Sequence, residues 1–404
     1  MKEFYKRDSC RLCGSKHLDL ALPLKKSPLC DAYIKEKKEQ TFYDLNLYLC
    51  KECSFVQIDT VIDPEVIYRD YIYVTTSSLG LVEHFEKYAH EVCDFLKLTE
   101  SNLTVDIGSN EGTLLSYFKS IGHKVLGIEP SFKAAEIANQ TGINTLPDFF
   151  NEELAKKIID NYSHADLITI NNLYANIDDL ENFTKGVEFL LSKDGVLVIE
   201  SSYLLDMINN MVFDFIYHEH LSYFSILPLM TFFKKFNMKL INLQEVGTKG
   251  GSMRYFFAKE GSKWNVHQSV EVLGKKEKDA NVGLTLFQKW EEKINREKEN
   301  LLEYLKPYKG KKIVGYGASA TSTTLISHFG LHEYFSYLVD ENPGKIDTFS
   351  PGYHIPVYGP EILNEDGIDV LIILAWRYKE NILRKLPNLN AKIIIPLPYF
   401  EVLA

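Results

Sequence analysis

The feature that most constrains the fold is an alternation of strand, turn and helix that begins at Leu103. An apolar run at residues 103–107 ends in a glycine, Gly108, and a helix at residues 81–96 precedes it. The same pattern then continues, with strands expected at 124–128, 167–170 and 195–200 and a helix at 132–141. Such alternation requires right-handed crossovers and produces a mostly parallel sheet with helices on both faces. The sequence therefore predicts a doubly wound α/β domain.

A second, shorter series of the same kind lies near the C-terminus. Strands are expected at residues 312–316, 335–339, 370–375 and 392–395, and a highly charged stretch at 266–308 with helical spacing of its apolar residues precedes them. A chain of 404 residues is too long for one ordinary hydrophobic core. We therefore predict three domains, at residues 1–70, 71–265 and 266–404. The last would contain a helical connector and a second, smaller Rossmann-like sheet.

Composition and charge exclude several classes of protein. The chain is 45% apolar and 25% charged, and it contains no apolar run long enough to cross a bilayer. Its start lacks the apolar core of a secretory signal, so we expect a cytoplasmic protein with no membrane partner. A net charge of −10, with basic residues spread along the chain, also argues against nucleic acid. For the oligomeric state we expect a monomer or a weak homo-oligomer.

Four cysteines near the N-terminus form two Cys-x-x-Cys pairs, Cys10 with Cys13 and Cys50 with Cys53. Two such turns supply the four tetrahedral ligands of a structural zinc site, which has no open position for chemistry. The alternative is a set of buried or redox-active thiols, for which one pair would suffice. Residues 1–60 show little periodic apolar pattern, so we expect a metal rather than a core to organise them. Cys30 and Cys93 stand alone and are expected to be ordinary thiols.

The loop after the first strand, Val105-Asp106-Ile107-Gly108-Ser109-Asn110-Glu111-Gly112, predicts a cofactor site. Its glycines allow close approach of a ligand, and the start of the following helix favours a carboxylate. Glu129, about 20 residues later, is suited to accept two ribose hydroxyls. Asp106 stands where a dinucleotide loop needs glycine, which favours S-adenosylmethionine over NAD; a merely structural turn is the third possibility. The residues assigned to the cofactor are Asp106, Gly108, Ser109, Asn110, Gly112, Glu129, Pro130 and Asn171.

Together with the cysteine pairs and this loop, further motifs carry a family resemblance. They are Phe213-Asp214-Phe215-Ile216-Tyr217-His218-Glu219-His220-Leu221-Ser222-Tyr223, Gly250-Gly251-Ser252-Met253-Arg254, Gly315-Tyr316-Gly317-Ala318, Asp340-Glu341-Asn342-Pro343 and Pro351-Gly352-Tyr353-His354-Ile355-Pro356. Over nearly its whole length the chain resembles the nucleotide-sugar C-methyltransferases. The resemblance implies an N-terminal zinc domain, a central methyltransferase domain and a C-terminal Rossmann-like domain. It also implies that a nucleotide-linked keto-deoxysugar binds between the last two.

The same resemblance assigns catalytic roles. His220 would be the general base, Tyr217 would stabilise an enolate by hydrogen bonding, and Glu219 would orient the imidazole or bind substrate. Tyr73, with Tyr71 as the second choice, would lie near the transferred methyl group or the sugar. The competing interpretations are a buried hydrogen-bonded cluster for the first three residues and a β-rich connector for the tyrosines.

The sequence departs from the family at three places. Asn176 stands where the family carries a His, Lys249 stands where a His often precedes Gly-Gly-Ser, and Ala320-Thr321-Ser322 replaces a commoner Ala-Lys-Gly. Asn176 cannot take up a proton, so either it acts only as a hydrogen-bond donor or the protein acts on a different substrate. The leading hypothesis is carbon methylation beside the ketone of a nucleotide-linked keto-deoxysugar. The alternatives are O- or N-methylation of such a sugar, or a non-catalytic sugar-nucleotide-binding protein. The Gly315-x-Gly317 turn could bind the nucleotide or only pack a helix.

Overall fold

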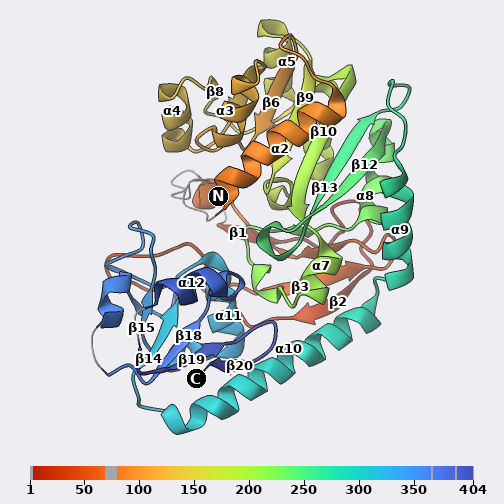
Figure 1. Cartoon of the computed structure of the whole chain (residues 1–404). Helices are drawn as coiled ribbons and strands as arrows, with labels where there is room; N and C mark the ends of the chain where they lie inside the picture. The colour runs from red at the N-terminus through yellow and green to blue at the C-terminus, as the bar shows by residue number, and fades with distance from the viewer. Residues whose placement is uncertain (1–2, 69–79, 365–366, 387–388, 404) are drawn as a thin grey trace.

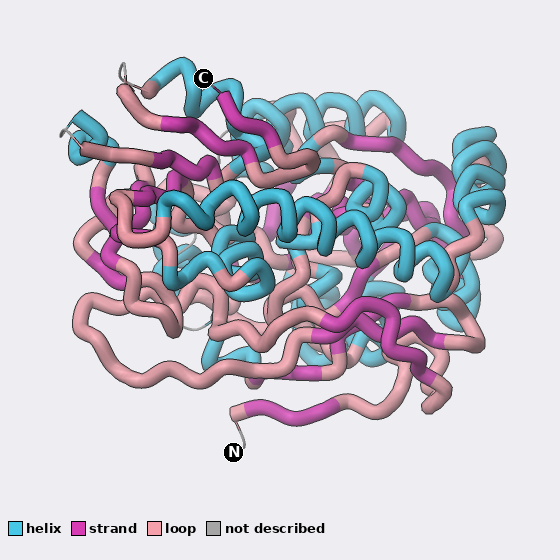
Figure 2. The backbone as a smooth tube through the Cα atoms, turned by 90° about the horizontal axis from the view of Figure 1, so that it is seen from below, coloured by secondary structure: helices cyan, strands magenta, loops and turns pink. Residues whose placement is uncertain are grey.

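The computed structural model describes residues 3–68, 80–364, 367–386 and 389–403. Figure 1 shows a large α/β unit above a smaller one, with the N-terminal strands between them and two helices, α9 and α10, along one side. Seen from below, the N-terminus and the C-terminus lie at opposite edges (Figure 2). Across the described ranges, no helix is both long enough and apolar enough to cross a membrane.

The central sheet has the order β12-β13-β10-β9-β6-β7-β8 in the described residues. Strands β6 to β10 run parallel, whereas β13 pairs antiparallel with both β10 and β12. The strand order reverses between β6 and β9, so the carboxyl ends of these two strands border the crevice where open α/β sheets bind ligands. The strands are β6 Leu103–Ile107, β7 Lys124–Ile128, β8 Thr145–Leu146, β9 Ala165–Asn171, β10 Leu191–Ser202, β12 Met238–Val246 and β13 Ser252–Lys259.

Helices cover both faces of this sheet, because its strands are apolar on both sides. Along β10, Val196 and Val198 pack with α2 and α3, while Leu197 and Ile199 pack with α5 and α6 on the opposite face. The helices of this unit are α2 Leu81–Leu96, α3 Thr113–Ser120, α4 Phe132–Gln140, α5 Glu152–Asn161, α6 Leu180–Leu190, α7 Leu204–Asn209 and α8 Ile226–Phe233. The predicted doubly wound fold is confirmed.

The C-terminal sheet has the order β16-β17-β15-β14-β18-β19-β20 and is parallel except at its two edge strands, β16 and β20. All four strands expected from the sequence are present. The elements are β14 Ile313–Tyr316, β15 Phe335–Val339, β16 Thr348–Phe349, β17 Pro356–Tyr358, β18 Val370–Ile373, β19 Lys392–Ile395, β20 Glu401–Leu403, α11 Ala320–Phe329 and α12 Lys379–Lys385. The expected charged connector is a pair of helices, α9 Gln268–Ala280 and α10 Leu284–Leu305.

The N-terminal residues form two small antiparallel sheets, and here one expectation was wrong. Leu47, Val56 and Ile58 are fully buried and belong to an apolar cluster that continues into the C-terminal sheet. A hydrophobic core therefore organises this region in addition to any metal. The sequence did not reveal this core, because the strands that form it are too short to show a periodic apolar pattern. They are β1 Phe4–Lys6, β2 Leu18–Pro23, β3 Asn46–Cys50, β4 Val56–Ile58 and β5 Thr60–Ile62, followed by helix α1 Pro64–Tyr68.

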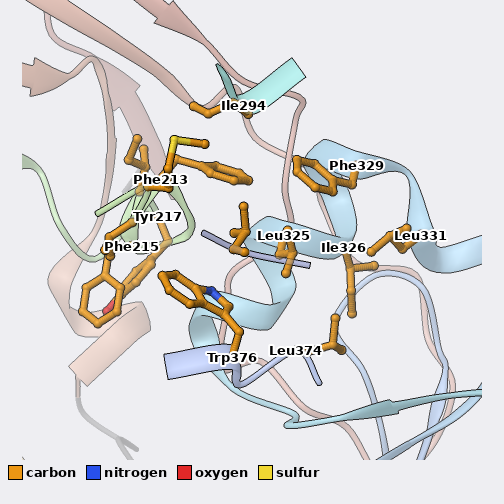
Figure 3. Close-up of a cluster of buried hydrophobic side chains, with 14 of the residues drawn as sticks. Phe213, Phe215, Tyr217, Ile294, Leu325, Ile326, Phe329, Leu331, Leu374 and Trp376 are labelled. Carbon is orange, nitrogen blue, oxygen red and sulfur yellow. The ribbon is translucent and has the colours of Figure 1, made fainter. Parts of the chain in front are cut away.

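The long segment between the two cysteine pairs binds the C-terminal unit. The carboxylate of Asp31 lies 2.9 Å from the Lys345 ammonium, and the amide N–H of Gly352 donates to the Gln40 side chain at 2.8 Å. Phe213 and Phe215 of the motif at residues 213–223 also pack against this unit, in the apolar cluster that contains Phe329 and Trp376 (Figure 3). All three parts of the chain thus contribute residues to this apolar cluster, while most of the central sheet packs in separate clusters.

Candidate active site

The four paired cysteines come together in one cluster, with all their sulfur atoms within 4.8 Å of one another. The Sγ atoms of Cys10 and Cys53 are 3.6 Å apart and those of Cys13 and Cys50 are 3.5 Å apart. Four thiolates at about 2.3 Å from a tetrahedral zinc ion would be separated by about 3.8 Å, so this donor set fits zinc. The lone thiols Cys30 and Cys93 are buried outside the cluster.

Matching backbone turns build the two halves of this cluster. In the first, the amide N–H of Gly14 donates to the Cys10 carbonyl at 2.9 Å, and Gly14 has a φ of 77°. In the second, Ser54 makes the same bond to the Cys50 carbonyl at 2.9 Å with a φ of 58°. Glycine favours this left-handed conformation, so sequence inspection singles out the first turn but gives no signal for the second.

The predicted cofactor loop lies at the carboxyl end of β6. Gly108 has a φ of 80°, and a Cβ atom there would lie 2.8 Å from Cδ2 of Leu173. No side chain caps the start of α3, and the buried hydroxyl of Ser109 has no hydrogen-bond partner among the described residues. These exposed amides and the unpartnered hydroxyl fit the polar methionine end of S-adenosylmethionine.

Two carboxyl groups flank this loop, and neither has its usual pKa. Burial and the charge of Glu129 raise the pKa of Asp106 to about 7, although the Thr169 hydroxyl donates to its Oδ1 at 2.6 Å. Glu129 accepts bonds from the amide N–H groups of Asn110 at 3.0 Å and Ser131 at 2.8 Å. Burial raises its pKa as well. The backbone thus fixes the Glu129 carboxylate at the strand end, where a ribose would lie.

The C-terminal sheet repeats this arrangement. Asp340 follows β15 and accepts bonds from the amide N–H groups of Ala318 at 2.6 Å and Asn342 at 2.8 Å. Gly317, at the end of β14, has a φ of 110°, and a Cβ atom there would lie 2.6 Å from that of Ala375. In both sheets a carboxylate after the second strand binds the loop after the first. Sequence inspection named the two C-terminal motifs, but it did not pair them.

The motif at residues 213–223 places an imidazole in a defined tautomer. Nδ1 of His220 lies 3.2 Å from the carbonyl oxygen of Phe215, which can only accept, so Nδ1 carries the proton. The lone pair is then on Nε2, 3.2 Å from the Tyr217 hydroxyl. Burial, and next the charge of Lys249, lower the pKa of His220 to about 3, so the ring is neutral near pH 7.

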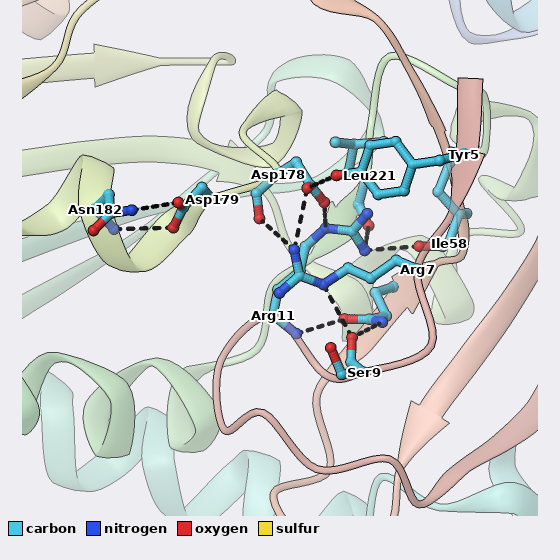
Figure 4. Close-up of polar contacts among 10 residues, drawn as sticks. Tyr5, Arg7, Ser9, Arg11, Ile58, Asp178, Asp179, Asn182 and Leu221 are labelled. Carbon is cyan, nitrogen blue, oxygen red and sulfur yellow. Dashed lines mark hydrogen bonds and ion pairs between the residues drawn. The ribbon is translucent and has the colours of Figure 1, made fainter. Parts of the chain in front are cut away.

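A buried arginine ties this motif to the cysteine cluster (Figure 4). Arg11, between Cys10 and Cys13, donates through Nη1 to the carbonyls of Ile58 at 2.7 Å and Leu221 at 3.3 Å. Its Nε donates to Asp178 at 2.9 Å, and Arg7 and Tyr5 also contact that carboxylate. Burial lowers the pKa of Arg11 to about 10, so its charge persists.

One cavity of about 1320 Å³ joins these parts. Its walls include the cofactor loop with Asp106, Gly108, Ser109 and Asn110; Glu129, Pro130, Asn171 and Asn176; the residues Tyr217, Glu219 and His220; and the C-terminal residues Gly317, Thr321, Asp340, Lys345, Arg377 and Lys385. Gly112 lies in the loop but is not among the lining residues. Tyr73 and Tyr71 lie outside the described residues.

Sequence inspection missed several charged residues of the cavity. Arg377 donates to both carboxylate oxygens of Asp214 at 2.9 Å and to the Thr321 hydroxyl at 3.1 Å, and it follows β18 just as the other site loops follow their strands. Lys345 and Lys385 also line the cavity. All three cations belong to the C-terminal unit. In that unit Ala320-Thr321-Ser322 replaces the Ala-Lys-Gly that is commoner in the family, so the lysine of that motif is missing. The position of Arg377 shortly after β18 could have revealed it, whereas Lys385 is the last residue of α12 and carries no such signal.

The doubly wound sheet and the loop at the carboxyl end of β6 define an S-adenosylmethionine-dependent methyltransferase. Three family models match the chain in succession: "Putative zinc binding domain" at residues 10–68, "Methyltransferase domain" at 82–243 and "C-methyltransferase C-terminal domain" at 247–398. The chain belongs to the C-methyltransferase family that combines these three domains.

A relative with the same extent is the C-methyltransferase NovU of Streptomyces niveus, 27% identical over 407 residues, covering 98% of this chain and 97% of NovU. Among solved structures, magnesium protoporphyrin IX methyltransferase of Synechocystis with bound S-adenosylmethionine is 12% identical, with a TM-score of 0.37 over 50% of this chain and 99% of the other. A methyltransferase of Clostridium acetobutylicum is also 12% identical, with a TM-score of 0.35 over 45% and 92%.

Proposed function

We propose that this C-methyltransferase acts on the carbon beside the ketone of a nucleotide-linked keto-deoxysugar. The observation that carries the proposal is the continuous cavity, because it joins a cofactor loop, a neutral histidine and a second nucleotide-type loop. The presence of these three features in one cavity suits a substrate that has a reactive sugar at one end and a nucleotide at the other. The domains in this proposal are residues 1–70, 71–265 and 266–404.

His220 has the tautomer that a general base requires. Its Nε2 atom holds the lone pair, to which the Tyr217 hydroxyl donates in this structure, and it can accept the proton from the carbon beside the ketone when that hydroxyl turns away. Once Nε2 is protonated, the Tyr217 hydroxyl no longer has an acceptor there and can donate to the enolate oxygen. The growing negative charge on that oxygen favours the imidazolium and thereby raises the pKa of His220 during the step.

Other residues orient the reactants. Glu219 lines the same cavity and would bind the sugar or steer the imidazole, and Asn176, whose side-chain oxygen has no partner among the described residues, would bind a sugar hydroxyl. Bound S-adenosylmethionine supplies an electrophilic methyl group, and Glu129, Pro130 and Asn171 would hold its nucleoside. Tyr73 is proposed to lie near the methyl group. The four-cysteine cluster would hold zinc for structure, since four thiolates complete its coordination.

Mass spectrometry in heavy water tests the proposal. The purified protein is incubated with S-adenosylmethionine and the thymidine, uridine, cytidine and guanosine diphosphate derivatives of 4-keto-6-deoxyhexoses. We expect a product that is heavier by one methyl group on a ring carbon, and loss of activity in His220→Asn but not in the exposed His164→Asn control. A methyl group on oxygen or nitrogen, with no deuterium at carbon, would establish the O- or N-methyltransferase alternative. Cofactor binding without methylation or exchange would favour a binding protein.

A further inference from the structure

Lys249 is a half-buried cation in the cavity wall. It lines the cavity together with Glu219 and His220. Among the residues that the structure describes, no hydrogen bond or ion pair involves its ammonium group. A lysine surrounded by protein loses hydration, and that loss is normally offset by a carboxylate. An ammonium group that no described residue hydrogen-bonds is available to an oxygen atom of a bound substrate that becomes negatively charged.

The backbone at Lys249 adopts a conformation that is costly for a residue with a side chain. Its φ is 55° and its ψ is 23°, in the left-handed region, at a cost of about 1–2 kcal/mol. Such a conformation persists only where the surroundings enforce it. Here the Asn210 amide donates to the Gly250 carbonyl at 2.8 Å, and a Cβ atom on Gly251 would lie 2.4 Å from that of Asp206. The loop is therefore held in a fixed position.

The carboxylates near this loop attract Lys249 only from a distance. Glu200 and Glu219 both raise the pKa of Lys249, but in the described part of the chain neither forms an ion pair with it. Arg377, whose Cδ would lie 3.2 Å from a Cβ atom on Gly250, is already paired with Asp214. Glu200 favours the charged lysine, but His84 at 2.6 Å and Arg254 at 3.0 Å occupy its carboxylate.

Lys249 also acts on the candidate base. Burial lowers the pKa of Lys249 to about 8, so most of it is still charged near pH 7. Its charge in turn lowers the pKa of His220. The positive charge of Lys249 thus favours the neutral form of the imidazole that would remove the proton.

We propose that Lys249 is a catalytic residue whose ammonium group binds the ketone oxygen of the substrate and stabilises the enolate. This inference rests on the proposed function. His220 Nε2 takes the proton, the carbon–hydrogen electron pair becomes the new carbon–carbon double bond, and the carbonyl π pair moves to the oxygen beside Lys249. When the carbon takes the methyl group, those electrons return, the ketone re-forms and the sulfonium leaves as a thioether. Lys249 keeps its protons throughout. Asn176 can offer this oxygen only a neutral hydrogen bond.

Deuterium incorporation at the substrate carbon, followed for the sugar that the wild-type protein methylates, tests this role. Lys249→Met removes the charge at similar length, Lys249→Arg keeps it, and the exposed Lys275→Met is the control. Removing one preorganised group typically costs about 10²–10³-fold in kcat. In Lys249→Met we expect the rates of exchange and of methylation to fall by this factor. We expect partial recovery of both rates in Lys249→Arg and wild-type rates in the control. The affinity of Lys249→Met for S-adenosylmethionine should be unchanged, which shows that the variant is folded.

The pH profile gives a second readout that a structural role would not change. Without the nearby positive charge the pKa of His220 should rise, so the acid limb of the exchange rate should move to higher pH. Within the described ranges, the imidazole of His220 hydrogen-bonds the Tyr217 hydroxyl and the Phe215 carbonyl, and Lys249 is the charged group that shifts its pKa. A wild-type exchange rate in Lys249→Met would overturn the inference. A rise in KM with kcat unchanged would also overturn it, because that result indicates a lysine that only binds the substrate. If the wild-type protein itself neither exchanges nor methylates, the proposed function fails first.

Discussion

Replacing Asp178 by Asn should destabilise the contact between the cysteine-rich N-terminal region and the candidate catalytic motif at residues 213–223. The Arg11 side chain is fully buried, and that of Asp178 is 18% exposed. Removing one partner of a buried ion pair costs about 3–5 kcal/mol, because the remaining charge is left without compensation. The partial exposure of Asp178 places the expected loss at the lower end, about 3 kcal/mol.

Urea unfolding, followed by circular dichroism and fluorescence, measures this loss. With a slope of about 2–3 kcal/mol per molar urea, a loss of about 3 kcal/mol lowers the midpoint of the affected transition by about 1–1.5 M. Because Arg11 also binds the carbonyl next to His220, we expect kcat to fall more than KM rises. Asp8→Asn is the matched control, since Asp8 pairs with Lys16 at the same distance of 2.9 Å, but at the surface. A midpoint within about 0.2 M of wild type, with kcat unchanged, would refute the role of this ion pair.

Three further predictions concern the bound groups. Plasma mass spectrometry should detect one zinc atom per chain in the wild-type protein and in Cys93→Ala, but none in Cys50→Ser. Equal zinc contents in the two variants would contradict the four-sulfur site. Because the pKa of Asp106 is about 7 and a cationic ligand stabilises its carboxylate, cofactor binding at pH 6.5 should release a proton. Calorimetry in buffers of different ionisation enthalpy measures this release, which should vanish above about pH 8 and in Asp106→Asn. Glu129→Gln should weaken cofactor binding by about 10–100-fold in Kd, the effect of one or two charge-assisted hydrogen bonds, while the exposed Glu136→Gln should bind normally.

The sequence alone determined the local features of this protein. The periodicity of apolar residues predicted four strands of each of the two larger sheets, since strand and helix periods depend only on neighbouring residues. It did not predict the other described strands of those sheets, which are β8, β12, β13, β16, β17 and β20. Motif spacing likewise brought the four cysteines into one group and placed the cofactor loop at the end of β6, because a turn of a few residues has a small set of conformations. The family resemblance added His220 as the candidate general base.

Only the tertiary structure determined what depends on contacts between distant segments. The N-terminal core was missed because its short strands are buried by residues more than 150 positions away, such as Tyr223 against Val56. The tautomer of His220, the pairing of Arg11 with Asp178 and the isolation of Lys249 likewise depend on which groups meet in space. A sequence records the type of each side chain, but hydration, charge compensation and pKa depend on its neighbours in the fold. For that reason Lys249 is only a departure from a motif in the sequence, whereas in the structure it is a cation whose charge lowers the pKa of the candidate base and whose ammonium group no described residue hydrogen-bonds.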